Sequence, residues 1–480
     1  MDVLKRLFEK RFHAEVEKIE PLQGKLGGSG RAILRMHGGG FVAIGVVYSV
    51  LDENRAFLEF SRHFKSHGLA VPEIYGEDLA QSAYLEEDLG DTTLFDYLSS
   101  HRQGDAIDSE VLEAYRKVIA ELPRFQVDAG RDLNYKFCYP RASFDRQSIA
   151  WDLNYFKYYF LRLSGVPFNE QALEHDFARL TRFLLAADHD YFLYRDFQSR
   201  NVMLYRGKPY FLDYQGGRKG ALQYDIASLL YDGKADVPPK LRHELLDYYL
   251  NCLAQHIDLK RDAFMEHYYG YVYIRILQAL GAYGFRGFYE RKTHFLQSVP
   301  YALNNLRWLA ENVKLPIELP ALMEALERMS NSDKLLNLAA PGEIAPSDGL
   351  TVRIFSFSFH GEKPSDESGN GGGFVFDVRS LPNPGREERF KQLTGKDEAV
   401  IEYLNGQPAV HQYIANVCAL VDESVSVYCR RGFNNLMVSF GCTGGQHRSV
   451  FLAETLAKHL REMNKVNIVV RHVALEKMAK

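Results

Sequence analysis

The sequence predicts an α+β part with two lobes, followed by a separate α/β part. Three observations support this prediction: short β-branched segments come first, helical periodicity dominates the residues after them, and strands alternate with helices towards the carboxyl end. At 480 residues the chain is long enough for several domains. We therefore expect an amino-terminal lobe, a carboxyl-terminal lobe, a Pro- and Gly-rich linker and a last domain at residues 1–90, 91–335, 336–350 and 351–480, respectively.

The composition is that of an ordinary globular protein. Hydrophobic residues make up 46% and charged residues 25% of the chain, and the formal net charge is −4. This balance excludes a generally basic nucleic-acid-binding protein. The five cysteines follow neither a zinc-binding nor a disulfide spacing. Because the chain contains neither an apolar leader nor a run of about 18 apolar residues, we expect a cytoplasmic protein without a membrane segment.

The amino-terminal lobe is predicted to hold short strands and one long helix. Residues 14–50 contain β-branched runs and a glycine-rich turn at Leu26–Arg31. Asp52 can cap the helix that follows, and the aromatic side chains of this helix lie on one face, at Phe57, Phe60 and Phe64. Residues 84–90 indicate a strand that runs into a hinge.

A hairpin at residues 191–214, between two long helical stretches, has polar residues suited to phosphoryl transfer. Asp196 and Asn201 lie five positions apart in a polar loop, and Asp213 ends the next apolar run. Transfer of a phosphoryl group from ATP requires one carboxylate that accepts the proton of the attacking hydroxyl. It also requires an amide oxygen and a second carboxylate that hold Mg²⁺ against the phosphates. The residues and their spacing favour this chemistry over a chance Arg-Asp pair in a surface loop.

Residues 1–335 resemble the aminoglycoside phosphotransferase and choline kinase superfamily. The resemblance covers the glycine-rich turn, the helix after it, the hinge, the loop at residues 195–201 and Asp213. It implies an α+β protein-kinase-like bilobal fold, with ATP and Mg²⁺ as cofactors. By this resemblance Asp196 is the catalytic base, and Asn201 and Asp213 are the ligands of Mg²⁺.

The same resemblance implies further roles in the catalytic loop and the nucleotide site. Gln198 and Arg200 shape the loop or contact the substrate, and Asp225 braces the loop as a structural residue. The residues implied to contact the nucleotide come from the glycine-rich turn and the hinge and are Gly27, Gly28, Ser29, Gly30 and Glu87. For the glycines, a plain hairpin turn is the alternative.

One feature of the superfamily is missing from the sequence. The third strand usually carries a lysine that pairs with the phosphates and with a helix glutamate, but no lysine occurs in residues 26–64. Arg31 or Arg35 is expected to supply the positive charge, with Glu53 as its partner on the helix. Bacterial anomeric sugar kinases also lack this lysine, and the catalytic loop with the following Met203 is similar to theirs.

That similarity implies an N-acetylglucosamine or N-acetylmuramate acceptor, phosphorylated at C1 in cell-wall recycling. An aminoglycoside acceptor is the alternative. The predicted helix at residues 148–163 is aromatic rather than acidic, with Trp151, Tyr155 and Tyr159 among its members. Aromatic rings stack on sugar C–H surfaces, whereas polycationic aminoglycosides are bound by acidic residues. Packing into the core is the other explanation for these rings.

A strand, a glycine-rich loop and a helix follow one another near the carboxyl end. The apolar run Leu436–Phe440 leads into Gly441–Ser449, and a helix is predicted from Val450. In this arrangement backbone N–H groups and the helix dipole capture an anion, and Arg448 adds donors. We therefore predict a phosphate or phosphosugar site. The spacing from Cys442 to Arg448 is also that of phosphotyrosine-type phosphatases, so a thiolate nucleophile is the alternative.

Residues 351–475 resemble the C-terminal domain of the RNase adapter protein RapZ. Four separated motifs match in the same order, at residues 355–361, 376–384, 393–397 and 441–450. In that family the domain senses glucosamine-6-phosphate and binds small regulatory RNA. The resemblance implies a phosphosugar pocket formed by His360, Arg379, Asn383, Thr443, Gly444, Gly445, His447, Arg448 and Ser449. The chain has no P-loop sequence like that family's. The basic residues of the tail are suited to RNA phosphates, but a solvated helix face is the other explanation for them.

Both halves thus indicate amino-sugar metabolism. We expect an ATP- and Mg²⁺-dependent kinase of an N-acetyl amino sugar, fused to a sensor of an amino-sugar phosphate. The alternative is a non-catalytic regulatory adapter that binds an amino-sugar phosphate, RNA or both.

Overall fold

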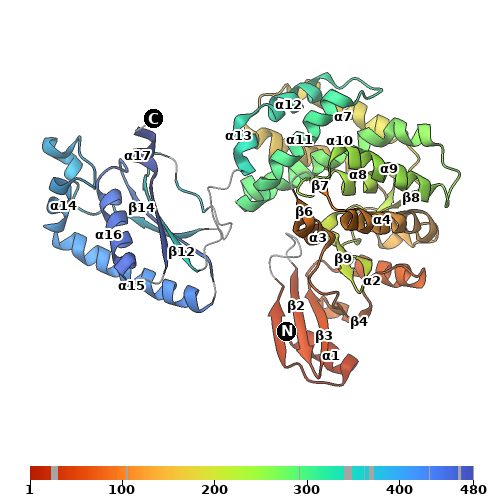
Figure 1. Cartoon of the computed structure of the whole chain (residues 1–480), viewed down its shortest axis with the longest axis horizontal. Helices are drawn as coiled ribbons and strands as arrows, with labels where there is room; N and C mark the ends of the chain where they lie inside the picture. Colours follow the sequence, from red (N-terminus) through yellow and green to blue (C-terminus); the bar gives the residue numbers. More distant parts are fainter. Residues whose placement is uncertain are drawn as a thin grey trace. The chain divides into compact units, whose positions relative to one another are not determined.

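The computed structural model describes residues 1–22, 31–103, 106–290, 292–339, 349–361, 363–366, 372–431, 433–462 and 466–478 (Figure 1). The chain divides into two compact units, one of residues 1–290 and 295–339 and the other of residues 291–294 and 340–480. The predicted order, an α+β part followed by an α/β part, is confirmed by the elements of these units.

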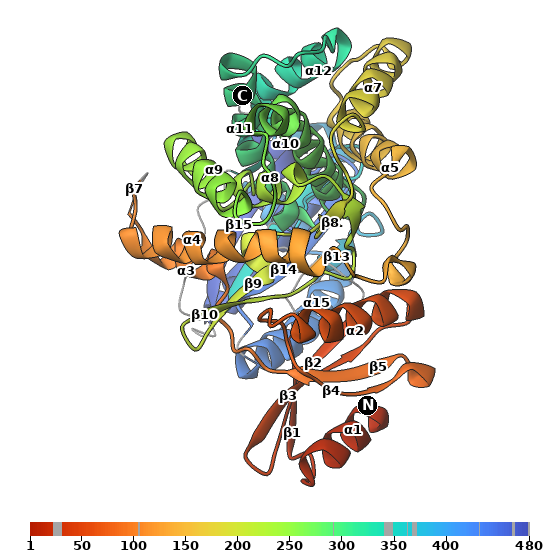
Figure 2. The same cartoon turned by 90° about the vertical axis from the view of Figure 1, so that its right-hand side faces the viewer.

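The first lobe of the first unit is an antiparallel sheet with a helix on each face (Figure 2). α1 (Asp2–Phe12) packs on one face and α2 (Leu51–Ser66) on the other. Gly45 in the third strand allows α1 to come close, because a Cβ there would lie 2.8 Å from a methyl carbon of Leu4. Along the sheet the strands are β1 (Lys18–Pro21), β2 (Ala32–Gly38), β3 (Phe41–Val47), β5 (Ala83–Glu87) and β4 (Ile74–Asp78).

The helix α2 has the aromatic face that the sequence predicts, but a different start. Phe57, Phe60 and Phe64 are at most 4% exposed and pack into the core of the unit. The predicted cap at Asp52 is wrong, because the helix begins at Leu51 and Val50 occupies the capping position without a side-chain hydrogen bond. Asp52 instead lies in the first turn, where its charge complements the helix dipole.

The second lobe is mainly helical and surrounds two short strand pairs. β8 (Tyr191–Leu193) pairs with β11 (Arg218–Gly220), and β9 (Val202–Tyr205) forms a two-residue hairpin with β10 (Lys208–Phe211). A further pair is β6 (Arg102–Gln103) with β7 (Ala106–Ile107). The helices are α3 (Leu94–His101), α4 (Ser109–Pro123), α5 (Arg146–Phe156), α6 (Arg162–Ser164), α7 (Glu170–Leu184), α8 (Gln223–Leu230), α9 (Pro239–Leu253), α10 (Arg261–Gly284), α11 (Val299–Asn312), α12 (Pro320–Ser330) and α13 (Asp333–Leu336).

The second unit is built on a parallel sheet in the order β13-β14-β12-β15. The two central strands are buried almost throughout, whereas the edge strands alternate between more exposed and more buried residues, as their positions in the sheet require. The strands are β12 (Thr351–Ser358), β13 (Gly373–Asp377), β14 (Asn435–Cys442) and β15 (Asn467–His472), and the helices are α14 (Glu398–Asn405), α15 (Pro408–Arg430), α16 (Arg448–Glu462) and α17 (Val473–Met478).

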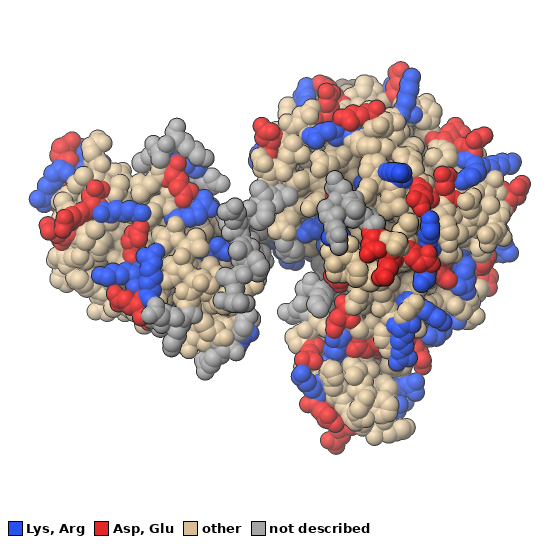
Figure 3. All heavy atoms as spheres, viewed as in Figure 1, with Lys and Arg blue, Asp and Glu red and all other residues tan. Residues whose placement is uncertain are grey.

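Among the described residues, none of the helices combines the length and the apolar character that crossing a bilayer requires. On the face drawn in Figure 3, basic and acidic side chains are interspersed over both units, as the small net charge leads one to expect.

Candidate functional site

The predicted catalytic loop is held by a buried carboxylate on the following helix. Asp225, in α8, accepts the backbone N–H groups of Tyr194 at 2.9 Å and Arg195 at 3.0 Å. Gln126 donates to the same carboxylate at 2.9 Å. Burial raises the pKa of Asp225 to about 7, against the lowering effect of these hydrogen bonds. The interpretation of Asp225 as a brace of the loop is thereby confirmed.

A second anchor, which the sequence did not reveal, comes from α5. Asp152 forms a two-pronged ion pair with the guanidinium of Arg195, at 2.6 and 2.7 Å. Arg195 also donates to the hydroxyl of Tyr224 at 2.7 Å. The backbone of Arg195 has φ of +84°, and that of Asp213 has φ of +65°. Non-glycine residues rarely adopt such angles, and they cluster at functional sites where the surrounding contacts enforce them.

The three residues predicted to carry the chemistry lie together behind these anchors. The side-chain amide of Asn201 donates to the carbonyl oxygen of Asp196 at 2.8 Å and to Oδ2 of Asp213 at 3.3 Å. Gln198 donates to Oδ1 of Asp196 at 3.3 Å. Burial and the nearby Asp213 raise the pKa of Asp196 above its usual value, although neighbouring arginines oppose this shift.

Arg31 lies between Glu53 and Asp213, as expected of a residue that replaces the missing lysine. Its guanidinium donates to Oδ1 of Asp213 at 3.3 Å and forms an ion pair with Glu53 in the first turn of α2. The Arg31 side chain is 12% exposed. Although burial opposes its charge, Asp213 and then Tyr84 and Glu53 hold the pKa of Arg31 above the usual value. The arrangement places one buried positive charge between the helix glutamate and the metal-binding candidate.

Arg35 and Glu87, which are also predicted to contact the nucleotide, have partners near the hinge. Arg35 donates to Asp88 at 3.0 Å and to Asp91 at 3.2 Å, so its charge is used at the hinge. Glu87 accepts the backbone N–H of Glu73 at 3.2 Å, within the sheet. The glycine-rich turn with Gly27, Gly28, Ser29 and Gly30 lies outside the described residues.

Arg200 is exposed and stacks over the ring of Phe95, with its Cζ 4.5 Å from the ring centre. This contact turns it towards α3, so a role in shaping the loop fits the structure better than contact with a substrate.

Gln215 is a further residue of the site that the sequence reasoning missed. Its side-chain N–H donates to Oδ1 of Asp213 at 2.5 Å. Its Oε1 is buried and has no hydrogen-bond partner among the described residues. A buried, unpaired amide oxygen beside a carboxylate suits a hard cation such as Mg²⁺. The position of Gln215, two residues after the aspartate that ends an apolar run, was the available signal.

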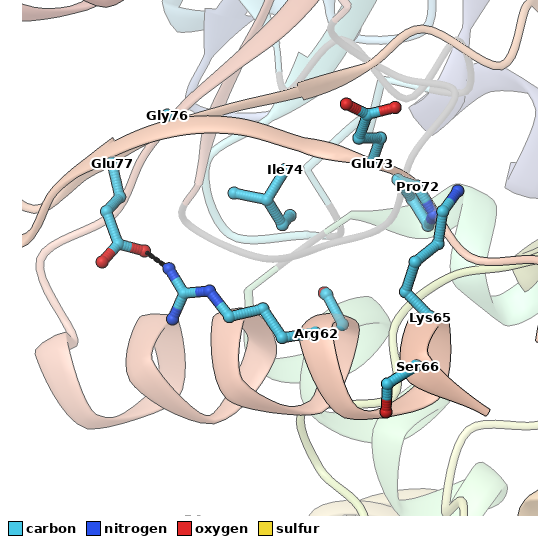
Figure 4. A pocket seen from close by; sticks show the side chains of 9 residues that line it. Arg62, Lys65, Ser66, Pro72, Glu73, Ile74, Gly76 and Glu77 are labelled. Carbon is cyan, nitrogen blue, oxygen red and sulfur yellow. Dashed lines mark hydrogen bonds and ion pairs between the residues drawn. The ribbon is translucent and has the colours of Figure 1, made fainter. Parts of the chain in front are cut away.

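A cavity of about 470 Å³ between α2 and β4 lies apart from these residues (Figure 4). Arg62 and Glu77 form an ion pair across it, and Lys65 and Glu73 line its other end. Because none of the catalytic-loop residues lines this cavity, we do not assign the chemistry to it.

In the second unit, parallel strands bring the predicted phosphosugar residues to one edge of the sheet. Ser358 at the end of β12 lies opposite Cys442 of β14, and Asp377 at the end of β13 lies opposite Gly441. The loops after these strand ends hold the predicted residues up to Ser449 in the first turn of α16. Ligands of open α/β sheets bind at this carboxyl edge.

The predicted phosphosugar residues fall into an accessible set and an enclosed set. The enclosed residues make internal contacts: the Nε2 of His447 lies 2.8 Å from the carbonyl oxygen of Phe390, and Arg448 donates to the carbonyl oxygens of Arg379 and Leu381 at 2.9 Å each. They therefore shape the loop. The accessible residues are His360, Arg379, Asn383, Thr443 and Gly444, and the enclosed ones are Gly445, His447, Arg448 and Ser449.

The contacts of Cys442 do not favour the phosphatase alternative. The residue is 3% exposed, and its sulfur accepts the backbone N–H of Gly445 and lies 3.1 Å from the hydroxyl of Ser449. A phosphatase arginine must face the phosphate, whereas Arg448 is directed at backbone carbonyl oxygens.

Comparison with known proteins finds a family match in each unit of the chain. Residues 28–261 match the phosphotransferase enzyme family, and residues 350–476 match the RapZ C-terminal domain. A nucleotide-binding protein of Azoarcus sp. (strain BH72) is 41% identical over 128 residues, which are 27% of this chain and 41% of the relative. One of Dechloromonas aromatica (strain RCB) is 39% identical over 133 residues, 28% of this chain and 45% of the relative. The chain spans about half or less of the length of the curated relatives that it matches.

Among solved structures, the choline kinase LicA from Streptococcus pneumoniae has a TM-score of 0.43 and 16% identity, covering 65% of this chain and 98% of that one. A microcompartment-associated aminopropanol kinase has a TM-score of 0.44 and 13% identity, with the same coverage of 65% and 98%. The match to the phosphotransferase enzyme family over residues 28–261 agrees with the α+β protein-kinase-like fold that the resemblance implied for this unit.

Proposed function

Because the chain combines a domain of the phosphotransferase enzyme family with a RapZ C-terminal domain, we propose that it is an ATP- and Mg²⁺-dependent kinase of an N-acetyl amino sugar whose second unit binds an amino-sugar phosphate. One observation supports the kinase activity most directly. Asp196, Asn201 and Asp213 lie beside a partly buried ion pair of Arg31 with Glu53. A protein that only bound ligands would not need this combination of base, metal ligands and cation.

In this proposal Asp196 accepts the proton of the attacking sugar hydroxyl. Its raised pKa makes it a stronger base than an exposed aspartate. Arg31 balances negative charge at the phosphates, in place of the usual lysine. Bound Mg²⁺ would be held by Asn201 and Asp213 and would neutralise the charge that develops on the transferred group. Such chemistry belongs in the cytoplasm, where ATP is available.

The aromatic helix α5 supports a sugar as the acceptor. Asp152 on this helix forms an ion pair with Arg195 of the proposed catalytic loop. This contact fixes the position of the helix relative to the loop. Tyr155 lies on α5, three residues after Asp152, and Tyr159 lies in the π-helical turn Lys157–Leu161 that continues the helix. The two rings lie against each other and against Phe285. This segment thus carries aromatic rings of the kind that stack on the C–H surface of a sugar.

The exposed guanidinium of Arg379 supports a phosphate ligand in the second unit. Its Cζ lies 4.2 Å from the ring centre of Phe359, and Asp377 accepts hydrogen bonds from it. The side chain is therefore held in place at the strand edge before any ligand arrives. A phosphate would bind there in competition with Asp377, and the second unit would report the level of product to the kinase.

Release of ADP by the purified full-length chain with Mg²⁺-ATP tests the kinase. The acceptors are N-acetylglucosamine, N-acetylmuramic acid, glucosamine and an aminoglycoside, and Asp196→Asn is the control. Turnover on an N-acetyl sugar that is lost in Asp196→Asn supports the proposal. Turnover on the aminoglycoside alone overturns the sugar acceptor. An absence of turnover on all four supports the adapter, whose next test is binding of glucosamine-6-phosphate and of RNA by the full-length chain.

A further inference from the structure

Three side chains that can bind a metal ion gather on the first unit, outside the residues discussed above. His63 and His67 are four residues apart at the end of α2, which places both on one face of the helix. Asp132 lies in the segment that follows Arg124–Ala129. Its Oδ1 is 3.1 Å from Nε2 of His67 and 3.5 Å from Nε2 of His63. The three ligand atoms all lie within 4.8 Å of one another.

This spacing is close to what a single transition-metal ion requires. Bonds of about 2.1 Å at tetrahedral angles place neighbouring ligand atoms about 3.4 Å apart. Two imidazoles and one carboxylate are the donors of many Zn²⁺ sites, whereas Mg²⁺ and Ca²⁺ prefer oxygen ligands. A fourth position remains for water.

The surrounding hydrogen bonds prepare one of the two imidazoles for such an ion. Nδ1 of His67 lies 3.0 Å from the carbonyl oxygen of His63, and an N–H donated there leaves the lone pair of Nε2 directed towards Asp132. Nε2 of His63 lies 2.7 Å from the carbonyl oxygen of Ala129. For Nε2 of His63 to bind a metal ion, the proton of the ring must move through solvent to Nδ1 of the same ring. The hydrogen bond to Ala129 is then lost.

The neighbouring charges permit a cation. Arg124 donates to the carbonyl oxygen of His67 at 3.2 Å, but its own charge is balanced by an ion pair with Glu121. The side chains of His63, His67 and Asp132 are 18%, 28% and 64% exposed, so an ion can reach the group from solvent.

We propose that His63, His67 and Asp132 form a binding site for a divalent transition-metal ion of the Zn²⁺ type. The ion links the last turn of α2 to the segment after Ala129. Because the first turn of the same helix holds Glu53 against Arg31, the ion restrains the helix that positions this pair. Binding of the ion does not itself depend on the proposed sugar kinase activity.

The alternative is a histidine–aspartate ion pair that needs no metal. The chain offers a matched control for it, because Nδ1 of His256 lies 3.0 Å from Asp128 on the same unit, in a pair without a second histidine among the described residues. An ion that binds to any exposed histidine–aspartate pair would bind with similar affinity at His256 and at the proposed site.

Calorimetric titration of the untagged full-length chain with Zn²⁺, in buffer with excess Mg²⁺, tests the proposal. The variants are His67→Gln, Asp132→Asn and, as control, His256→Gln. We expect one saturable equivalent in the wild type and in His256→Gln. In the other two variants the affinity should fall by more than the roughly 10- to 100-fold typical of losing an outer-shell partner. The proposed metal site is overturned if the isotherms of His67→Gln and Asp132→Asn equal that of the wild type, or if the wild type shows no saturable binding.

A second measurement identifies the ligands and checks folding. The wild type titrated with Co²⁺ should show visible bands without a sulfur-to-cobalt band in the near ultraviolet; a sulfur band would place the ion on a cysteine and contradict the proposal. Zn²⁺ should raise the thermal midpoint of the wild type and of His256→Gln, but not that of Asp132→Asn. Equal midpoints of all variants without metal show that the substitutions leave the fold intact.

Discussion

Replacing Arg31 by alanine tests the cation of the nucleotide site. The side chain is 12% exposed and contacts Glu53 and Asp213, the latter at 3.3 Å. A hydrogen bond to a charged group contributes about 1.5–3 kcal/mol. Because the Asp213 side chain is 39% exposed, solvent screening favours the lower end, so we expect about 1.5 kcal/mol of lost stability. Loss of one such contact to a phosphate should raise the KM for ATP by roughly 10- to 150-fold.

Steady-state kinetics with varied ATP, together with thermal unfolding, measures both effects. The matched control is Arg35→Ala, which removes the same side chain four residues away but affects the hinge carboxylates Asp88 and Asp91. Arg31→Lys should recover part of the affinity, because it restores a positive charge without the two-pronged geometry. If Arg31→Ala leaves the KM for ATP unchanged, or if Arg35→Ala raises it as much, Arg31 does not replace the missing lysine.

Three further predictions concern the anchors of the two sites. Asp152→Asn leaves the buried Arg195 without its carboxylate and should cost about 3–5 kcal/mol of stability and most of kcat, measured by denaturant unfolding and ADP release. Burial raises the pKa of Asp225 to about 7. The contribution of this side chain to the free energy of unfolding is therefore fully present below about pH 4 and is lost as the pH rises through 7. Over that pH range the free energy of unfolding of the wild type should therefore fall by up to about 4 kcal/mol relative to that of Asp225→Asn, as measured by denaturant unfolding at several pH values. A difference between the two proteins that does not change with pH would contradict this prediction. Arg379→Ala should abolish calorimetric binding of glucosamine-6-phosphate, whereas Arg461→Ala, which removes an arginine from the last turn of α16, at the other end of the helix from Ser449, should leave it intact.

That the proposed catalytic residues lie together could be predicted from the sequence because they are local. Asp196 and Asn201 lie in one short loop, and Asp213 ends the hairpin that follows, so spacing alone brings them together. The anchors could not be predicted in this way. Asp152 lies 43 residues before Arg195, and a buried ion pair between distant segments leaves no periodic signal in either.

The choice between Arg31 and Arg35 shows a second limit of the sequence. The two residues are four apart along an extended segment, so alternation places both on the same side and does not distinguish them. The two arginines differ in their acidic partners, which lie at the ends of neighbouring helices and strands. Asp88 at the hinge pairs with Arg35, while Glu53, in the first turn of α2, pairs with Arg31. The wrong prediction of a cap at Asp52 has a similar origin, since helix ends depend on the backbone that precedes them.

The helix α2 connects the observations on the first unit. Its first turn holds Arg31 through Glu53, and its middle contacts Tyr214, the neighbour of Asp213, through a hydroxyl–hydroxyl hydrogen bond of 2.6 Å from Ser61. Two independent contacts of one helix thus bear on the position of Asp213, the proposed ligand of Mg²⁺. Any ligand that restrains the last turn of α2 acts on both together. Its effect should therefore appear in the KM for the nucleotide rather than in kcat, because the base, Asp196, is held by the loop braced from α8.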